Sequence, residues 1–281
     1  MVKIKELYQK GIKILEENEI ETPKTDARVI LEYVLGVESG KLPLYYEKEA
    51  LLKIQNTYFN LIEKRKNHMP CSYITGKKEF MSLDFFVSDG VLIPRNETEN
   101  LCEYCIEKIN NMKINTVKVA DICSGSGCIG LSIAHYCKNS DVELFELSDD
   151  AIEISKKNKE SLFIKNADIY KMDILKEKPD TLYDVIISNP PYIPIEDIEY
   201  LMEEVRDYEP HIALTDGGDG IKFYKRLAEI SEYNLKPGGF MAVEVGINMY
   251  RDVKNIFDNY GKTEIIYDDF GIERIVVLQK G

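Results

Sequence analysis

The stretch VKVADICSGSGCIG, residues 117–130, changes character half-way along its length. It begins as a short apolar run, passes through three closely spaced glycines, and continues into an apolar segment that reaches Cys137. Glycines allow a tight turn and a close approach of a ligand to the backbone, and free N–H groups at a helix start favour a polar or anionic group. The stretch therefore predicts a strand over 117–122, a ligand-binding turn, and a helix over 128–137.

Strand and helix patterns alternate on the C-terminal side of this turn. The further predicted strands are 142–145, 169–172, 184–188, 240–245, 264–267 and 275–278, and the other predicted helices are 100–111, 149–158, 221–235 and 249–260. Strands interleaved with helices at this spacing favour a doubly wound, mostly parallel sheet. Residues 96–281 are therefore predicted to form an α/β domain of Rossmann-like type.

The N-terminal part of the chain has a different texture. Apolar residues recur at helical spacing from Ile4 onwards, Thr22-Pro23 is typical of a helix start, and Gly36 is typical of a helix end. These patterns predict a small all-helical domain over residues 1–70. Residues 71–95 are rich in aromatic and β-branched side chains, and Asp89-Gly90 between apolar runs is a hairpin signal, which predicts a β-hairpin linker.

Composition and charge exclude several classes of protein. No apolar run approaches the roughly 18 residues that would span a membrane, and the N-terminus has no apolar segment of a secretion signal. These features predict a cytoplasmic protein without a membrane partner. The first 90 residues carry equal numbers of basic and acidic side chains, so the whole net charge of −13 lies in residues 91–281. An acidic domain repels a polyanion, so no stable binding to nucleic acid is expected.

The six cysteines do not indicate a metal site. Cys102-Glu-Tyr-Cys105 is an isolated C-x-x-C pair, and the three histidines lie far apart in the sequence. We expect reduced thiols, no bound metal, and a plain amphipathic helix around this pair.

Glu146 supplies a second feature of a nucleotide-type ligand. It follows the apolar run 142–145, about 20 residues after the glycine turn, where an acidic side chain accepts hydrogen bonds from both hydroxyls of an adenosine ribose. Turn and glutamate alone do not separate a dinucleotide from S-adenosylmethionine. Asp121 before the turn and the Ser-Gly-Ser-Gly core at 124–127 favour a methyltransferase.

The corner ISNPPYIP, residues 187–194, ends another buried strand. In a sheet with strand order 3-2-1-4-5, Asn189 would lie at the crevice beside the first strand. The side-chain carbonyl of Asn189 and the backbone carbonyl of Pro190 would both accept hydrogen bonds from a planar –NH2 group. Tyr192 offers an aromatic face, and Pro190 and Pro191 stiffen the corner. A glutamine amide and the amino group of adenine fit this corner equally well.

Taken together, the motifs resemble the HemK/PrmC family of protein-(glutamine-N5) methyltransferases. The matching segments run nearly from end to end: Tyr73-Ile-Thr-Gly76, Val91-Leu-Ile-Pro-Arg95, Glu97-Thr-Glu99, Asp121 to Gly127, Asn189-Pro-Pro-Tyr192, Tyr208-Glu-Pro210, Gly217-Gly-Asp-Gly220, and Pro237-Gly-Gly-Phe240 with Glu244. The resemblance implies a class I methyltransferase fold and the conversion of S-adenosylmethionine to S-adenosylhomocysteine. The implied substrate is the glutamine of the Gly-Gly-Gln motif in class I peptide chain release factors, with residues 1–70 as the release-factor-binding domain.

The resemblance also implies roles for individual residues. The implied catalytic residues are Asn189, Pro190 and Tyr192, which bind the substrate together with Pro191. The implied cofactor-binding residues are Asp121, Cys123, Ser124, Gly125, Ser126, Gly127, Glu146, Asp173, Ile174 and Asn189. Cys123 departs from the usual first glycine of the loop, which bears on the cofactor fit, and Asn96 departs from the usual proline after Ile-Pro-Arg. The strand before Glu146 is predicted to be about two residues short.

Three other functions share some of these features. A glutamine methyltransferase of a large-subunit ribosomal protein would use the same corner, and so would a DNA adenine-N6 methyltransferase after base flipping. The acidic domain argues against the DNA substrate, and the Glu97-Thr98-Glu99 segment favours release factors over the ribosomal protein. A non-enzymatic S-adenosylmethionine-binding scaffold is disfavoured, because Asn189 would have no function in it.

Overall fold

The computed structural model describes residues 2–268 and 270–281, and the chain divides into two compact units. The first unit comprises Met1–Lys77 and Met202–Tyr208, and the second comprises Lys78–Leu201 and Glu209–Gly281. The sequence patterns do not mark the short segment Met202–Tyr208 as part of the first unit. Within the described ranges, no helix is long and apolar enough to cross a membrane.

The first unit is helical. Its elements are α1 (Ile4–Glu16), α2 (Pro23–Leu35), the 3-10 helix η1 (Leu42–Tyr45), α3 (Leu52–Lys66), α4 (Cys71–Thr75) and α8 (Glu203–Arg206). As the sequence predicts, α2 has proline at its first position and ends at Gly36, whose φ of 64° is left-handed. Leu7, Leu15 and Ile30 are among the side chains that form its buried core.

A buried ion pair network holds α8 within this unit. The Arg65 guanidinium donates from Nε to Asp26 Oδ2 over 2.6 Å, and its second nitrogen lies 2.8 Å from Glu204 Oε2. Burial lowers the pKa of Arg65, but the hydrogen bonds and charges of the two carboxylates outweigh burial and raise it. Tyr208 also donates its hydroxyl to the backbone oxygen of Asn67. The segment 202–208 is therefore fastened to α3 by polar contacts.

The predicted hairpin exists, but its turn lies elsewhere. Strands β1 (Lys77–Phe80) and β2 (Leu83–Phe86) pair through a two-residue turn at Met81 and Ser82, not at Asp89-Gly90. Both turn residues have positive φ, 51° and 57°, as the tight hairpin turns require. Glu99 accepts the Met81 N–H at 2.7 Å and Tyr136 donates to the Met81 carbonyl at 2.6 Å. These two hydrogen bonds stabilise a turn that lacks the usual glycine.

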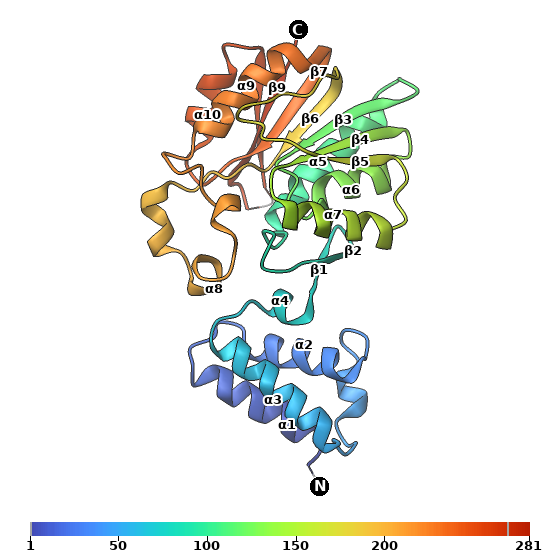
Figure 1. Cartoon of the computed structure of the whole chain (residues 1–281), viewed down its shortest axis with the longest axis vertical. Helices are drawn as coiled ribbons and strands as arrows, with labels where there is room; N and C mark the ends of the chain where they lie inside the picture. Colours follow the sequence, from blue (N-terminus) through green and yellow to red (C-terminus); the bar gives the residue numbers. More distant parts are fainter. Residues whose placement is uncertain (1, 269) are drawn as a thin grey trace. The chain divides into compact units, whose positions relative to one another are not determined.

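The second unit is built on a seven-stranded sheet in the order β5-β4-β3-β6-β7-β9-β8 (Figure 1). The strands are β3 (Val117–Ile122), β4 (Ser140–Glu146), β5 (Ala167–Lys171), β6 (Tyr183–Ser188), β7 (Leu235–Glu244), β8 (Lys262–Tyr267) and β9 (Glu273–Gln279). Only β9 pairs antiparallel, with β7 and β8. The doubly wound sheet and its predicted 3-2-1-4-5 order are confirmed. The sequence predicts that the strand before Glu146 is about two residues short, but β4 runs from Ser140 to Glu146 without a deficit.

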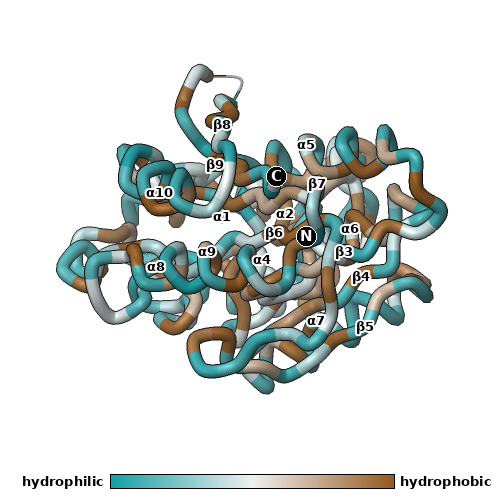
Figure 2. The backbone as a smooth tube through the Cα atoms, turned by 90° about the horizontal axis from the view of Figure 1, so that it is seen from above, coloured by the Kyte–Doolittle hydropathy of each residue, from teal (hydrophilic) through white to brown (hydrophobic). Residues whose placement is uncertain are grey.

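Helices cover both faces of this sheet (Figure 1). The helical elements are α5 (Glu97–Asn111), α6 (Cys128–Tyr136), α7 (Asp149–Ser161), η2 (Ile195–Tyr200), η3 (His211–Ala213), α9 (Lys222–Asn234) and α10 (Tyr250–Phe257). Strand β3 shows why two faces are needed: Val117 and Val119 pack in the cluster that contains α5 and α6, whereas Ala120 and Ile122 pack with α9 and α10. Hydrophilic and hydrophobic segments alternate along α9 and α10 in Figure 2, as expected of helices with one buried face.

Candidate active site

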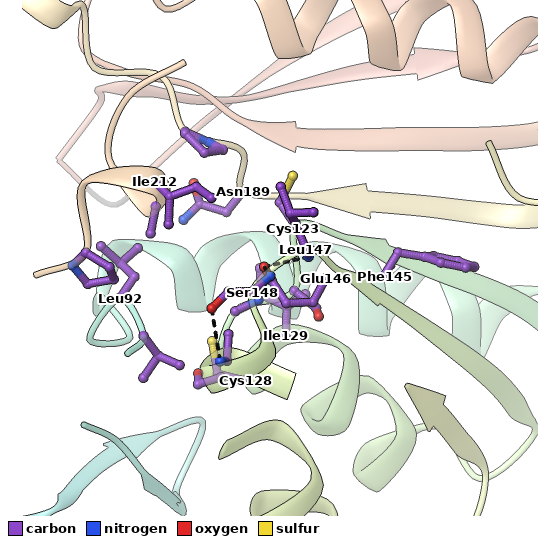
Figure 3. A pocket seen from close by; sticks show the side chains of 18 of the residues that line it. Leu92, Cys123, Cys128, Ile129, Phe145, Glu146, Leu147, Ser148, Asn189 and Ile212 are labelled. Atoms are coloured by element: carbon purple, nitrogen blue, oxygen red, sulfur yellow. Dashed lines mark hydrogen bonds between the residues drawn. The ribbon is translucent and has the colours of Figure 1, made fainter. Parts of the chain in front are cut away.

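The strand register brings four predicted site residues to one edge of the sheet. Ile122 pairs with Phe145 on β4 and with Ser188 on β6, so Cys123, Glu146 and Asn189 lie at neighbouring strand ends. Glu146 in turn pairs with Lys171, which places Asp173 just beyond the end of β5. In Figure 3, Cys123 lies between Asn189 and Glu146. The carboxyl ends of parallel strands are where ligands bind in sheets of this type.

The loop between β3 and α6 has the backbone that glycine favours. Gly125 and Gly127 have φ of 54° and 79°, and a Cβ atom on Gly127 would lie 2.5 Å from Ser155 Oγ. Cys123 has φ of 61°, so it occupies the left-handed region that favours glycine. The departure at Cys123 therefore keeps the loop shape and adds a side chain that lines the pocket.

Glu146 is held by the loops that surround the pocket. Its Oε2 accepts the Gly125 N–H at 2.7 Å, and its Oε1 accepts the N–H groups of Leu147 at 2.8 Å and Ser148 at 2.9 Å. Three backbone donors stabilise the carboxylate in one orientation, and Oε2, which accepts a single N–H, keeps a further lone pair. Glu146 is therefore pre-oriented to accept from neighbouring hydroxyl groups.

Asp121 supports the loop from behind. Its carboxyl is fully buried, and Oδ2 accepts the Gly130 N–H at the start of α6 over 2.8 Å. Its Oδ1 has no hydrogen-bond partner among the described residues. Burial raises the pKa of Asp121 to about 7, although the Gly130 N–H opposes the shift. Asp121 thus fixes the strand-to-helix turn.

An apolar slot lies beyond Glu146. Ile174 is buried there, with Met172, Leu175 and Phe223 among its fellow lining residues. Asp173 also lines the pocket: its Oδ2 lies 2.7 Å from Lys176 Nζ, and Oδ1 accepts the Leu175 N–H at 3.2 Å. The hydrogen bond from Lys176 lowers the pKa of Asp173, which stays ionised. A planar heterocycle with an amino group would find apolar walls and an acceptor here.

The Asn-Pro-Pro-Tyr corner follows β6. Asn189 donates from Nδ2 to Thr98 Oγ1 at 3.3 Å, which leaves its carbonyl oxygen as the free end of the amide. No described residue donates to the Pro190 carbonyl. The Tyr192 hydroxyl donates to Glu244 Oε1 at 3.4 Å. The corner thus carries two unused acceptors.

One pocket gathers most of the predicted residues (Figure 3). Those that line it are Cys123, Ser124, Gly125, Ser126, Glu146, Asp173, Ile174, Asn189 and Pro191. The lining does not include Asp121, Gly127, Pro190 or Tyr192. Among these four, Asp121 and Gly127 shape the loop, Tyr192 anchors the corner, and Pro190 keeps its unused carbonyl acceptor there.

Sequence reasoning left two partnerships unrecognised. Arg95 lines the pocket and donates to Glu209 Oε1 at 2.6 Å, while Glu209 Oε2 accepts the Ile93 N–H at 3.2 Å. The second partnership joins Tyr192 to the buried Glu244, whose Oε1 accepts the Tyr192 hydroxyl. All four residues lie in segments that the motif comparison names, but segments so far apart in sequence give no signal of their pairing.

Known proteins match both halves of the chain. Residues 6–76 match the family described as PrmC N-terminal domain, and residues 102–206 match the methyltransferase small domain. A release factor glutamine methyltransferase of Clostridium acetobutylicum is 42% identical, with 100% of this chain and 99% of that protein covered. One of Clostridium botulinum is 36% identical, with 99% of each covered. The chain belongs to the release factor glutamine methyltransferase family.

Solved structures agree with the fold of this family assignment. A methyltransferase of Pyrococcus furiosus superposes with a TM-score of 0.52 at 18% identity, covering 72% of this chain and 91% of that one. The 16S rRNA N2 G1207 methyltransferase of Thermus thermophilus, solved with S-adenosylmethionine and guanosine, gives 0.52 at 15% identity, covering 73% and 50%. Membership of the release factor glutamine methyltransferase family confirms the resemblance drawn from the sequence motifs.

Proposed function

We propose that this chain transfers the methyl group of S-adenosylmethionine to the side-chain nitrogen N5 of the glutamine in the Gly-Gly-Gln motif of class I peptide chain release factors, in the cytoplasm. Family membership over the full length supports the protein-glutamine methyltransferase class. The observation that carries the proposal is the free amide oxygen of Asn189, a residue that lines the same pocket as Glu146. An acceptor for a substrate –NH2 and an acceptor for a ribose thus share one pocket.

The residues of the pocket fit S-adenosylmethionine. Glu146 would accept the ribose hydroxyls, the slot around Ile174 would take the adenine with Asp173 near its amino group, and the loop from Cys123 to Gly127 would follow the methionine part. The bound group supplies a methyl on a positively charged sulfur. An acidic side chain at the end of the second strand is the usual ribose partner in such sheets.

The corner would act on the glutamine amide by orientation. An amide nitrogen is a weak nucleophile because its lone pair is delocalised. Two acceptors, Asn189 Oδ1 and the Pro190 carbonyl, would hold both hydrogens of the –NH2 group and so raise the electron density on nitrogen. The two prolines keep the acceptors in place before the substrate arrives, which reduces the entropy lost on binding.

We further propose that the helical unit binds the release factor. Leu44, Leu51 and Leu52 remain 70–75% exposed on it, and large apolar side chains in this number favour a protein contact. The double change of Leu51 and Leu52 to serine should raise KM for the release factor and leave kcat and the affinity for S-adenosylhomocysteine unchanged. An unchanged KM would contradict the assignment of this surface.

The decisive experiment is methyl transfer with defined substrates. The full chain is incubated with labelled S-adenosylmethionine and a purified class I release factor, and the Gly-Gly-Gln peptide is examined by mass spectrometry for one added CH2 on glutamine. A release factor with alanine in place of that glutamine is the control. Failure to label the glutamine at any enzyme concentration would refute the proposal.

The same assay separates the alternative substrates. Large-subunit ribosomal proteins and adenine-containing duplex DNA are offered in parallel under identical conditions. Transfer to a ribosomal protein alone would keep the glutamine chemistry and change the partner. Transfer to DNA would overturn the proposed substrate class. The net charge of −13 disfavours DNA as a substrate.

A further inference from the structure

One positive charge lines the pocket, and the roles proposed above leave it without a ligand. Among the described residues that line the pocket, the charged ones are Arg95, Glu146 and Asp173. The two acids would contact the ribose and the adenine amino group. S-adenosylmethionine also carries a carboxylate on its methionine part, and enclosing a carboxylate without a partner costs free energy. The charges of the pocket and the cofactor match if Arg95 takes this carboxylate.

Arg95 lies at the end of the pocket that the methionine part would reach. Thr98 donates its N–H to the Arg95 carbonyl at 3.2 Å, and its hydroxyl accepts from Asn189 Nδ2 at 3.3 Å. Strand β6 precedes Asn189 and strand β5 precedes Asp173, with β3 and β4 between these two strands in the sheet. With the adenine beside Asp173 and the sulfur beside Asn189, the methionine part would continue away from the adenine, at the end where Arg95 lies. Figure 3 shows Leu92, from the same segment as Arg95, on the Asn189 side of the pocket.

A buried carboxylate holds the Arg95 guanidinium in place. Glu209, whose side chain is 1% exposed, accepts from a terminal nitrogen of Arg95 at 2.6 Å, and its second oxygen accepts the Ile93 N–H at 3.2 Å. Among the described residues, this is the only hydrogen bond that the guanidinium makes, so most of its five N–H groups remain for a ligand. A planar guanidinium matches a carboxylate through two parallel hydrogen bonds. The Arg95 side chain is therefore oriented and still able to bind an anion.

The glycine loop offers few donors of its own for the carboxylate. A helix start commonly supplies free N–H groups to an anion. Here the Ser124 N–H already donates to the Phe145 carbonyl at 3.2 Å. The Gly125 N–H donates to Glu146 Oε2 at 2.7 Å, and the Gly127 N–H donates to the Ser124 carbonyl at 2.8 Å. A side-chain cation is therefore the stronger partner for the carboxylate.

We propose that Arg95 binds the carboxylate of the methionine part of S-adenosylmethionine, in the orientation that Glu209 gives the guanidinium. The proposal deepens the proposed function: it rests on S-adenosylmethionine as the cofactor and not on the release factor as the substrate. It makes the site selective for ligands that carry this carboxylate. An ion pair that served the fold alone would give no such selectivity.

The test compares two ligands that differ only in the carboxylate. They are S-adenosylhomocysteine and its decarboxylated analogue, in which hydrogen replaces that group, and titration calorimetry on the full chain gives both Kd values. The wild type should bind S-adenosylhomocysteine about 10- to 100-fold more tightly than the analogue, as expected of a charge-assisted hydrogen-bonded pair. Arg95→Gln should raise Kd for S-adenosylhomocysteine by about the same factor and leave Kd for the analogue unchanged.

Two further variants control for charge and folding. Arg251→Gln is the matched control, because Arg251 is an exposed arginine on α10 that contacts the Tyr250 hydroxyl at 2.9 Å and does not line the pocket. It should leave both Kd values as in the wild type. Arg95→Gln leaves the buried Glu209 without its cation, so the double variant Arg95→Gln/Glu209→Gln removes both charges. It should show the same loss of selectivity as Arg95→Gln.

The wild type alone can overturn the proposal, by binding the two ligands with equal Kd. Selectivity that persists in Arg95→Gln or in the double variant would also overturn it. Equal weakening of both ligands in these two variants would do the same, because that is the result expected of an ion pair that serves the fold alone. A wild type that shows the selectivity but methylates no release factor refutes the proposed function alone.

Discussion

A Cβ atom on Gly220 would lie 2.1 Å from the backbone oxygen of Tyr192. The Gly217–Gly220 segment therefore packs directly against the corner, and Gly220 is the point where no side chain fits. Its φ of 80° adds a second reason for glycine. Because the obstacle is backbone, it cannot move without moving Tyr192.

Replacement of Gly220 by alanine should therefore displace the corner. We expect kcat to fall by about 10²-fold, since small misplacements at a reacting centre have effects of this order. Gly217→Ala is the matched control, because Gly217 has φ of 76° and nothing within 4 Å of its Cβ position. Both variants bear the strain of positive φ, so equal activity losses in the two would contradict the packing argument.

Asn189→Ala removes the substrate acceptor and should nearly abolish methyl transfer. We expect a loss in kcat on the order of 10²- to 10³-fold, as for other groups that stabilise charge at a reacting centre. Because Glu146 and the slot around Ile174 are untouched, the affinity for S-adenosylhomocysteine should be largely retained. Unaltered turnover would remove Asn189 from the catalytic assignment.

Glu146→Gln should weaken cofactor binding. An amide nitrogen cannot accept from the N–H groups that now hold Glu146, and charge-assisted hydrogen bonds contribute about 1.5–3 kcal/mol each, so Kd for S-adenosylhomocysteine should rise by about 10- to 100-fold. The exposed Glu153, paired with Lys156 on α7, provides a control glutamine variant whose Kd should match the wild type. Titration calorimetry distinguishes the two.

Asp121 should make the fold less stable as pH rises. Its folded pKa of about 7 lies above its ordinary value of 3.8, so between these values the folded protein holds a proton that the unfolded chain has lost. Asp121→Asn keeps an acceptor for the Gly130 N–H and removes the titration. Between pH 5.5 and 8 the wild type should therefore lose about 2 kcal/mol more unfolding free energy than the variant, by urea denaturation. Parallel curves would contradict the buried-proton assignment.

The sheet was predictable because each strand and helix carries its own local signal. Alternating patterns located β3 to β9, and the turn around Gly125 and the corner at Asn189 fall at strand ends whose register follows from the strand order. The hairpin turn was mislocated because Met81 and Ser82 carry no turn signal and depend on Glu99 and Tyr136 for their hydrogen bonds.

The residues that support the site were harder to predict than those that line it. Arg95 and Glu209, or Tyr192 and Glu244, meet only in the folded structure, and no periodicity connects such distant positions. Asp121 stays a predicted cofactor-binding residue, and nothing in the sequence indicates that its carboxyl accepts the Gly130 N–H. Sequence motifs locate a site in the chain, but the packing of the folded structure decides which partner each side chain contacts.

The network around Arg65 has a consequence for synthesis of the chain. Asp26 precedes Arg65 in the growing polypeptide, but Glu204 leaves the ribosome only after four strands of the sheet, β3 to β6, have been made. The N-terminal helices must therefore wait, with one partner of a buried cation missing, until the catalytic corner has emerged. The ion pair network of the first unit is thus completed only after much of the second unit has been synthesised.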